Sequence, residues 1–549
     1  MIRIGNASGF YGDRFDAFAE MLDGGPLDVL TGDYLAELTM GILGRDLAKD
    51  STTGYAKTFL RQMRTSLDVA LDRGVTIVVN AGGLNPTGLA AALRELTDRT
   101  DLRIGLVTGD ALQREGALSA NAYLGAFGIA ACLTSGANVV ITGRVTDASL
   151  VVGPAIAHYG WAHDDLDPLA GATIAGHVLE CGTQATGGNY SFFTEIADLC
   201  HPGFPIAEIA ADGSATITKH PGTGGEVSIG TVTAQLLYEL GAPAYLGPDV
   251  VAHFDRIALR SDGPDRVTIS GAVGTPPPPT LKVGVTRLGG VRNSMTFVLA
   301  GLDIEAKAEL VRRQLTTKLG AGLDFNLVRT DRVDASTTET ASALLHVHAS
   351  VGRQFSQAAV ELALGSCPGA TLTTAPGDAT PYAIFTSESI DQDEVAHVAV
   401  RPDRSTVAIP PPAITEEPTV TRESPATDEP ANGQRRDRGA TVSRPLGEII
   451  GARSGDKGGD ANVGLWARSD EAYDWLRTTM TADKIRELLP EAAELDIDRY
   501  ELPNLRAVNF VIKEILGDGV GGSTRFDPQA KALGEVIRGR FVDVPVGLR

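Results

Sequence analysis

The run from Glu180 to Tyr190, Glu-Cys-Gly-Thr-Gln-Ala-Thr-Gly-Gly-Asn-Tyr, places a carboxylate, a thiol, two hydroxyls and two amides within eleven residues. Its three glycines let the backbone approach a ligand closely, and the run has little apolar surface to bury. We therefore predict a binding or catalytic loop. Glu180 could act as a general acid or base, because partial burial adjusts the pKa of a carboxyl group. Alternatively, Glu180 could hold the turn by accepting hydrogen bonds from loop amides.

A thiol and an imidazole stand next to this loop. The segment Leu169–Cys181 is typical of a helix that stops at Gly182, so His177 and Cys181, four residues apart, share one face. That pair could form a base and a nucleophile. However, the dipole at a helix C-terminus disfavours a thiolate, which favours a small thiol packed under the loop. The loop also offers three groups that could bind a substrate, which are Thr183, Gln184 and Asn189.

Five short apolar runs early in the chain end in glycine and small polar residues, and helical patterns lie between them. They are Ile2–Ile4, Leu27–Leu30, Thr76–Val79, Ile104–Val107 and Val139–Ile141. Such an alternation predicts an α/β fold with a largely parallel sheet that is covered on both faces. Because ligands bind beyond the carboxyl ends of such strands, we expect the polar strand ends to share one rim.

Several residues at this rim could carry chemistry. Asp147 could be a second acid or base, or simply a helix N-cap, and Arg144 could pair with a carboxylate or phosphate. Asp33 and Asp110 would complete a carboxylate cluster that could bind Mg²⁺, although no ligand spacing supports a metal site. Amide, hydroxyl and backbone donors for a substrate, which could instead only form turns, are Asn6, Ser8, Asn80, Gly82 and Gly83.

The rest of the chain suggests three parts. We predict a large domain over residues 1–401 with an α+β extension, a flexible Pro-rich charged linker over 402–443, and a small α+β domain over 444–549. The small domain contains a polar Gly-rich loop, Arg453–Asn462, in which Arg453 and Lys457 could touch a substrate. The segment Ala507–Leu516 is interpreted as a helix, so the GxGxxG match that follows it lacks the strand context of a dinucleotide site.

Composition excludes several classes of protein. The formal charge of −21 argues against binding to nucleic acid but permits a small anionic substrate in a locally basic pocket. The four cysteines have no zinc-site or disulfide spacing, and no cofactor is evident. Neither a signal peptide nor a membrane-spanning run is found, so we expect a cytoplasmic protein without membrane partners. The size of the chain favours a homo-oligomer.

Several motifs together resemble the acyclic terpene utilisation protein A (AtuA) family. They are Gly5–Gly9, Thr31–Glu37, Asn80–Gly83, Thr142–Asp147 and Glu180–Tyr190. The tail segment Arg453–Asn462 resembles the ferredoxin-like domain of that family, here fused at the C-terminus. The resemblance implies a role in catabolism of citronellol- or geraniol-like terpenoids through branched acyl-CoA esters.

Two hypotheses about function follow from these observations. Hydration or dehydration of an acyl-CoA would suit Glu180, Asp147 and the amide-rich rim, and would make the protein a lyase or hydratase with a CoA ester as substrate. The alternative is a non-catalytic component that binds an acyl-CoA or terpenoid within a carboxylase or lyase assembly.

Overall fold

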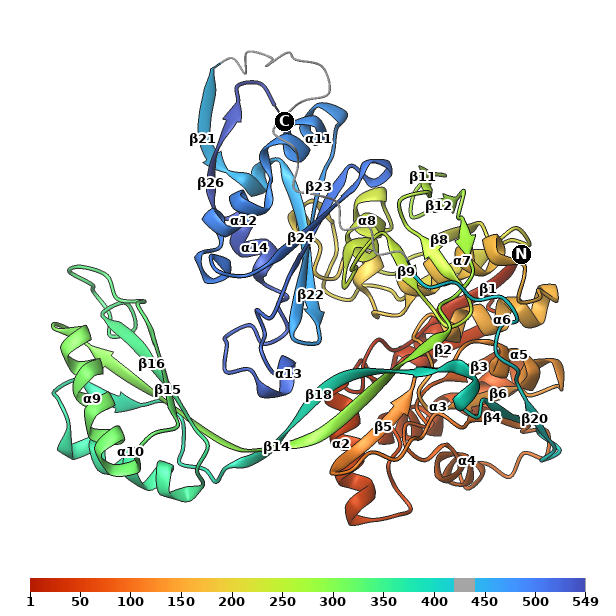
Figure 1. Cartoon of the computed structure of the whole chain (residues 1–549), viewed down its shortest axis with the longest axis horizontal. Helices are drawn as coiled ribbons and strands as arrows, with labels where there is room; N and C mark the ends of the chain where they lie inside the picture. Colours follow the sequence, from red (N-terminus) through yellow and green to blue (C-terminus); the bar gives the residue numbers. More distant parts are fainter. Residues whose placement is uncertain (419–439, 549) are drawn as a thin grey trace. The chain divides into compact units, whose positions relative to one another are not determined.

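A computed structural model describes residues 1–418 and 440–548 (Figure 1). The chain forms two compact units. The first comprises Met1–Thr286, Phe385–Val520 and Asp527–Arg549, and the second comprises Arg287–Ile384 and Gly521–Phe526. No helix within the described ranges is long and apolar enough to cross a membrane.

The first unit is built on an eleven-stranded sheet whose centre is parallel. Its five central strands pair in the order β1-β2-β3-β6-β4, which confirms the parallel strands predicted from the sequence. Their bounds are β1 Ile2–Asn6, β2 Val29–Gly32, β3 Thr76–Val79, β4 Ile104–Thr108 and β6 Val139–Thr142.

Antiparallel strands extend this centre at both edges. Four are added beyond β1 and two beyond β4. They are β7 Pro205–Ile209, β8 Ala215–Lys219, β12 Val267–Ser270, β11 Ala258–Ser261, β19 Val398–Val400 and β20 Thr406–Ala408. The small antiparallel sheet of β9 Ala244–Leu246, β10 Val251–His253 and β13 Gly274–Thr275 belongs to the same unit.

The parallel strands are mostly apolar, and both of their faces are buried. In β3, Ile77 and Val79 pack in one core while Val78 packs in the other, as the two-residue period of a strand requires. Helices α1 Ala17–Gly24, α3 Lys57–Arg73 and α4 Pro86–Arg94 contribute to the first core. The second core contains side chains from α5 Phe127–Thr134, α6 Ser149–Tyr159 and α7 Leu166–Leu179.

The second unit has its own small core. Helices α9 Ile304–Leu319 and α10 Arg353–Gly365 pack together against an antiparallel sheet (Figure 1). The sheet contains β15 Leu323–Val328, β16 Ser342–Ala349, β17 Ala370–Leu372 and the later part of β14 Thr280–Ala300. Strand β18 Thr380–Asp391 pairs with β14.

The C-terminal part of the first unit is an α+β domain with the antiparallel strand order β22-β23-β25-β24. Its bounds are β22 Ile450–Lys457, β23 Asp460–Ala467, α11 Asp470–Thr479, α12 Ala482–Leu488, β24 Ile497–Leu502, β25 Ala507–Ile512 and α14 Leu533–Arg538. Strands β21 Thr441–Pro445 and β26 Phe541–Pro545 pair beside this sheet.

Two local predictions for this domain are wrong. Residues 507–512 form strand β25 rather than a helix, because Ala507 and Val508 face different cores and burial on both faces hides the period of a strand. The segment Arg453–Asn462 is mostly a hairpin of β22 and β23, which turns where Gly458 adopts a left-handed φ of +66°.

The predicted linker 402–443 includes β20 and the start of β21, whereas its residues 419–439 lie outside the described ranges.

One face of the C-terminal sheet packs on α8 Ile229–Leu237 of the large domain. Two buried amides bind carbonyls at the end of this helix and in the loop after it: Asn462 donates to the Leu237 carbonyl at 2.6 Å, and Asn509 donates to the carbonyls of Leu240 and Gly241, each at 2.8 Å. Carbonyls at a helix C-terminus have no partner within the helix, so these amides satisfy groups that burial would otherwise leave unpaired.

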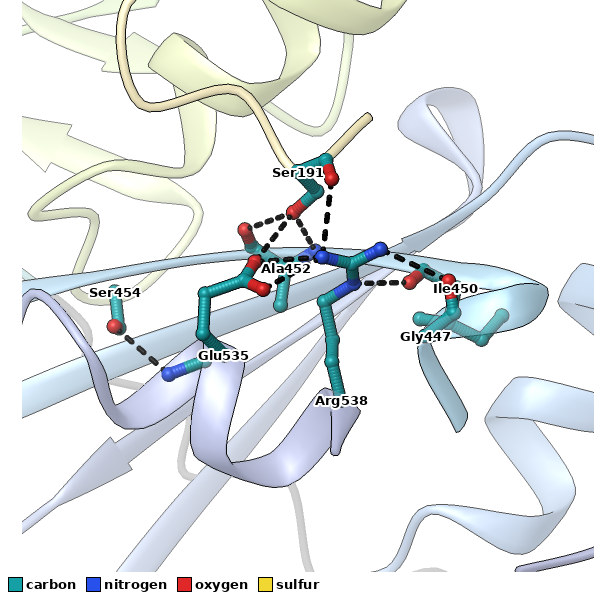
Figure 2. Close-up of polar contacts among 8 residues, drawn as sticks. Ser191, Gly447, Ile450, Ala452, Ser454, Glu535 and Arg538 are labelled. Atoms are coloured by element: carbon teal, nitrogen blue, oxygen red, sulfur yellow. Dashed lines mark hydrogen bonds and ion pairs between the residues drawn. The ribbon is translucent and has the colours of Figure 1, made fainter. Parts of the chain in front are cut away.

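Ser191 fastens the same interface (Figure 2). Its hydroxyl accepts from the Ala452 amide at 2.9 Å and lies 2.8 Å from the Ala452 carbonyl, with Glu535 Oε1 at 3.1 Å as a second acceptor. Arg538 donates to the Ser191 carbonyl at 3.1 Å. One buried serine thus binds the backbone of β22, the strand that ends at Lys457.

We expect the Ser191→Ala variant to lose about 1–3 kcal/mol of unfolding free energy, because it leaves the buried Ala452 amide without its partner. Chemical denaturation and limited proteolysis of the full chain would measure the loss. Ser214→Ala is the matched control, since the Ser214 hydroxyl binds Asp212 within an exposed turn. Equal stability of both variants would contradict a fastening role for Ser191.

Candidate active site

A histidine and a glutamate form a buried pair at the end of α7. His177 Nε2 lies 3.1 Å from the Gln235 carbonyl oxygen, and His177 Nδ1 lies 3.1 Å from Glu180 Oε1. Because a carbonyl can only accept, Nε2 carries the hydrogen, and Nδ1 of the neutral ring faces Glu180 as an acceptor. The rings of Tyr245 and Phe254 enclose the imidazole.

Burial makes both members of this pair neutral. It lowers the pKa of His177 to about 4. It also raises the pKa of Glu180 well above its ordinary value, and the charges of Asp147 and Glu239 raise it further. The protonated Glu180 therefore lies beside an unprotonated nitrogen, and both His177 Nδ1 and Glu180 Oε2 are buried without a hydrogen-bond partner among the described residues.

The rim of the parallel sheet brings a second group of charges close to Glu180. Arg144 donates to the Leu35 carbonyl at 2.7 Å and pairs with Asp147 at 3.2 Å, with its guanidinium 4.1 Å from the centre of the Tyr123 ring. Burial, then the charge of Asp147, raises the pKa of Asp33 well above its usual value, and Arg144 opposes this shift. The charge of Asp147 raises the pKa of both Asp33 and Glu180, so its carboxylate lies within electrostatic range of both acids.

Amides and hydroxyls predicted to bind substrate hold this rim in place. Asn80 donates to Asp33 Oδ1 at 2.6 Å and accepts from the Tyr34 amide at 2.8 Å. Ser8 donates to the Asp33 carbonyl at 3.0 Å. Asn6 donates to the Leu179 carbonyl at 2.6 Å and so ties the end of α7 to β1. These side chains position the charged groups through bonds within the protein.

Other predicted residues shape turns. A Cβ on Gly82 would lie 2.4 Å from the Thr142 carbonyl oxygen, and Gly83 has a φ of +52°. The Thr183 carbonyl accepts from the Gly188 amide at 3.0 Å, and Asn189 is exposed with a φ of +59°. The structure gives these four positions a part in backbone geometry and does not place them with the charged groups.

The C-terminal domain contributes two cations that bind the large domain near these acids. Arg453 donates to Gln184 Oε1 and stacks 4.2 Å from the centre of the Tyr238 ring. Lys457 donates to the Glu239 carbonyl at 3.1 Å. Although the Lys457 side chain is exposed, surrounding protein and then the charge of Lys282 lower its pKa.

Sequence reasoning missed several members of this cluster. Asp456 has a pKa raised to about 7 by burial and by the charges of Glu239 and Glu37. Burial raises the pKa of Tyr245 well above its usual value, and the charge of Glu180 raises it further. No motif marks these residues, because they meet only after folding. Asp456 alone had a signal, its place beside Lys457 in the family-like segment.

The remaining predicted acid, Asp110, stays at the rim but has a structural partner set. It accepts from Asn121 at 2.8 Å and from the Arg144 amide at 2.8 Å, and burial raises its pKa to about 6. Within residues 1–418 and 440–548, no group of three or more His, Cys, Asp or Glu side chains has the geometry to hold a metal ion.

The comparisons with known proteins agree with the motifs. Residues 2–401 match the model of the acyclic terpene utilisation family protein AtuA, and residues 444–543 match the AtuA ferredoxin-like domain. Both matches confirm the resemblance recognised in the sequence. A search of curated proteins returned no match.

Cysteine reactivity provides a test of the electrostatics. Burial raises the pKa of the Cys181 thiol well above its ordinary value, and the charge of Glu180 adds to the effect. We expect iodoacetamide near neutral pH to label the exposed Cys200 first and Cys181 much more slowly, as followed by mass spectrometry of the peptides. Labelling of Cys181 at the rate of Cys200 would contradict a raised pKa of the partly buried Cys181 thiol.

The pH dependence of stability tests the His177–Glu180 pair. The unfolded chain binds a proton at His177 as pH falls through about 6.5, whereas folded His177 does so only near 4. Stability from neutral His177 is therefore lost on acidification, and Glu180, whose pKa is raised, has the opposite sign.

We expect His177→Gln to be less destabilising at pH 5 than at pH 7 by about 1–2 kcal/mol of unfolding free energy. Glu180→Gln should be less destabilising at high pH than at low pH, because neutral glutamine removes the cost of ionising a buried carboxyl. Denaturant titrations at several pH values measure both trends. Parallel pH profiles for the two variants would show that the pair is not neutral.

Proposed function

This chain belongs to the acyclic terpene utilisation family, and we propose that it catalyses an acid–base step on a terpenoid or branched acyl-CoA ester. The proposed reaction is hydration of a double bond in the acyl group, or the reverse dehydration. Its principal support is Glu180, a carboxylic acid kept neutral by burial beside a neutral imidazole and close to the charge of Asp147.

The two carboxyl groups divide the chemistry of dehydration. The Asp147 carboxylate takes the proton from the carbon next to the thioester carbonyl. The bond between the neighbouring carbon and its hydroxyl oxygen then breaks, and Glu180 donates its proton so that water leaves. In the hydration direction Glu180 takes the proton of the attacking water and Asp147 returns a proton to carbon. Each group ends the reaction in the protonation state that the reverse reaction needs.

The ammonium groups of Lys457 and Lys282 could bind the negative charges of such a substrate. Removal of the proton at carbon shifts negative charge to the thioester oxygen, which a preorganised cation stabilises. Lys457 is exposed, and Lys282, also exposed, lowers its pKa, so the two ammonium groups lie within electrostatic reach of each other. A locally basic wall of this kind can attract the phosphates of CoA although the whole chain carries a formal charge of −21.

The His177 imidazole positions Glu180 in this proposal. Its Nε2 hydrogen is fixed on the Gln235 carbonyl, so Nδ1 stays an acceptor directed at Glu180. Glu180 Oε2 is buried and has no hydrogen-bond partner among the described residues, so its hydrogen-bonding capacity is not used by the protein. The pKa of His177, lowered to about 4, prevents the ring from taking the proton of Glu180 at neutral pH.

The test is turnover of a series of branched and unsaturated acyl-CoA esters in water labelled with ¹⁸O, followed by mass spectrometry. We expect Glu180→Gln and Asp147→Asn each to lower kcat by about 10²–10⁴-fold, the usual contribution of a positioned acid or base. Both changes nearly preserve shape. Glu115→Gln is the matched control, since Glu115 is exposed.

Retention of full activity by both variants would overturn the proposal. Binding of acyl-CoA without turnover by the wild-type chain would instead support a non-catalytic component of a carboxylase or lyase assembly.

A further inference from the structure

The segment Leu237–Gly241, at the end of α8, is held along its length by the C-terminal domain. Strands β22, β23 and β25 each contribute one side chain that binds backbone carbonyls of this segment. Lys457 donates to Glu239 at 3.1 Å, Asn462 to Leu237 at 2.6 Å, and Asn509 to Leu240 and Gly241, each at 2.8 Å. The position of the segment is therefore set by the docked domain.

Glu239, in the middle of this segment, has a backbone conformation that glutamate rarely adopts. Its φ of +54° lies in the left-handed region, which costs a glutamate free energy that a glycine would not lose. Its side chain lies beside β22, because a Cβ on Gly455 would be 3.1 Å from Glu239 Cγ. Among residues 1–418 and 440–548, no hydrogen bond or ion pair holds its carboxylate. Strain of this kind, kept for a carboxylate that the protein does not bind, points to a functional role.

The ends of α7 and α8 lie side by side, which brings Glu239 near Glu180. His177 Nε2 donates to the Gln235 carbonyl at 3.1 Å, and Gln235 Nε2 donates to the His177 carbonyl at 3.0 Å. Glu180 follows His177 by three residues, and Glu239 follows Gln235 by four. The two bonds that join the helices therefore also fix the two acids relative to each other.

The charge of Glu239 acts on Glu180. Burial and the charge of Asp147 raise the pKa of Glu180 most, Glu239 raises it further, and Arg144 and Lys457 oppose the shift. Ionisable groups within electrostatic range of Glu180 or Glu239 come from α2 Glu37–Lys49, the turn between β6 and α6, α7 and its end, the end of α8, β9 and β22. They are Glu37, Arg144, Asp147, His177, Cys181, Tyr238, Tyr245, Arg453, Asp456 and Lys457.

We propose that Glu239 is a positioning residue for the acid step: the C-terminal domain presents its carboxylate to Glu180, and this negative charge keeps the proton on Glu180. The inference rests on the proposed function, in which Glu180 donates that proton to the leaving hydroxyl. It gives the C-terminal domain a part in the chemistry, because three of its strands hold the segment that carries the charge.

Infrared absorption of protonated carboxyl groups tests the proposal without a substrate. The part of this absorption that is lost in Glu180→Gln reports Glu180. In Glu239→Gln, the absorption of Glu180 should disappear at a pH about one unit lower than in the wild-type chain, because no negative charge at position 239 then opposes ionisation of Glu180. Glutamine nearly preserves the shape of the side chain.

Two further variants separate the charge of Glu239 from the conformation of its segment. Glu514→Gln is the matched control, because Glu514 is an exposed glutamate with a φ of +57°, and it should leave the absorption of Glu180 unchanged. Glu239→Gly removes the same charge and relieves the left-handed backbone. It should shift Glu180 as Glu239→Gln does, with an unfolding temperature at least as high as that of Glu239→Gln.

The pH dependence of dehydration of a branched 3-hydroxyacyl-CoA ester gives a second readout. Glu180 must be protonated to donate, so kcat falls as pH rises through its pKa. We expect this fall to begin about one pH unit lower in Glu239→Gln. The highest kcat of the profile should change by much less than the roughly 10²-fold loss expected for a reacting acid or base.

The outcomes distinguish this proposal from the proposed function. A lowered infrared midpoint supports the action of Glu239 on Glu180 even where the wild-type chain turns over no ester and the proposed reaction fails. An unmoved midpoint in Glu239→Gln overturns the proposal, and so does an equal shift in Glu514→Gln. A loss of kcat by about 10²-fold or more at every pH would make Glu239 a reacting group, which also overturns a positioning role.

Discussion

Burial of ionisable groups at the end of α7 is the constraint on which the site depends. Eleven consecutive residues of this helix, Leu169–Leu179, are buried, so its C-terminal end carries His177 and Glu180 into the interior. Neither group can be charged there without a large loss of hydration, and each is neutral beside the other. The bond from Asn6 to the Leu179 carbonyl and the bond from His177 to the Gln235 carbonyl fix the pair to β1 and α8. Packing of α7 thus keeps the carboxyl group of Glu180 protonated.

The C-terminal domain completes what α7 begins. The Asn462 amide caps the end of α8, the Asn509 amide binds the loop that follows, and the Ser191 hydroxyl binds the backbone of β22. Strand β22 ends at Asp456 and Lys457, so the contacts that dock the domain also set the position of its charges. The hairpin that follows turns at Gly458 and leaves Lys457 exposed. The contacts that dock the C-terminal domain therefore also position Asp456 and Lys457.

The sequence predicts the elements with a simple period better than it predicts their partners. The five parallel strands are recognisable because each is apolar throughout and ends in glycine and polar residues, which also locates Asp33, Arg144 and Asp147 at one rim. Strand β25 is not recognisable, because its apolar residues continue into Ile515 and Leu516 and give the stretch the length of a short buried helix. Glu239, Tyr245 and Asp456 meet Glu180 across long stretches of chain, and electrostatic proximity of this kind has no local signature.

The surroundings of each ionisable side chain decide which protonation state it favours and so which chemical step it can perform. Cys181 lies next to Glu180, but its thiolate would be buried among acids, which opposes its use as a nucleophile. The same burial gives Glu180 a transferable proton at neutral pH, because a carboxyl with a raised pKa is a competent acid where an ordinary one would be ionised. Asp147, paired with Arg144 and partly exposed, lies in different surroundings. Two carboxyl groups in contrasting environments can hold opposite protonation states, which is the requirement for adding or removing water across a double bond.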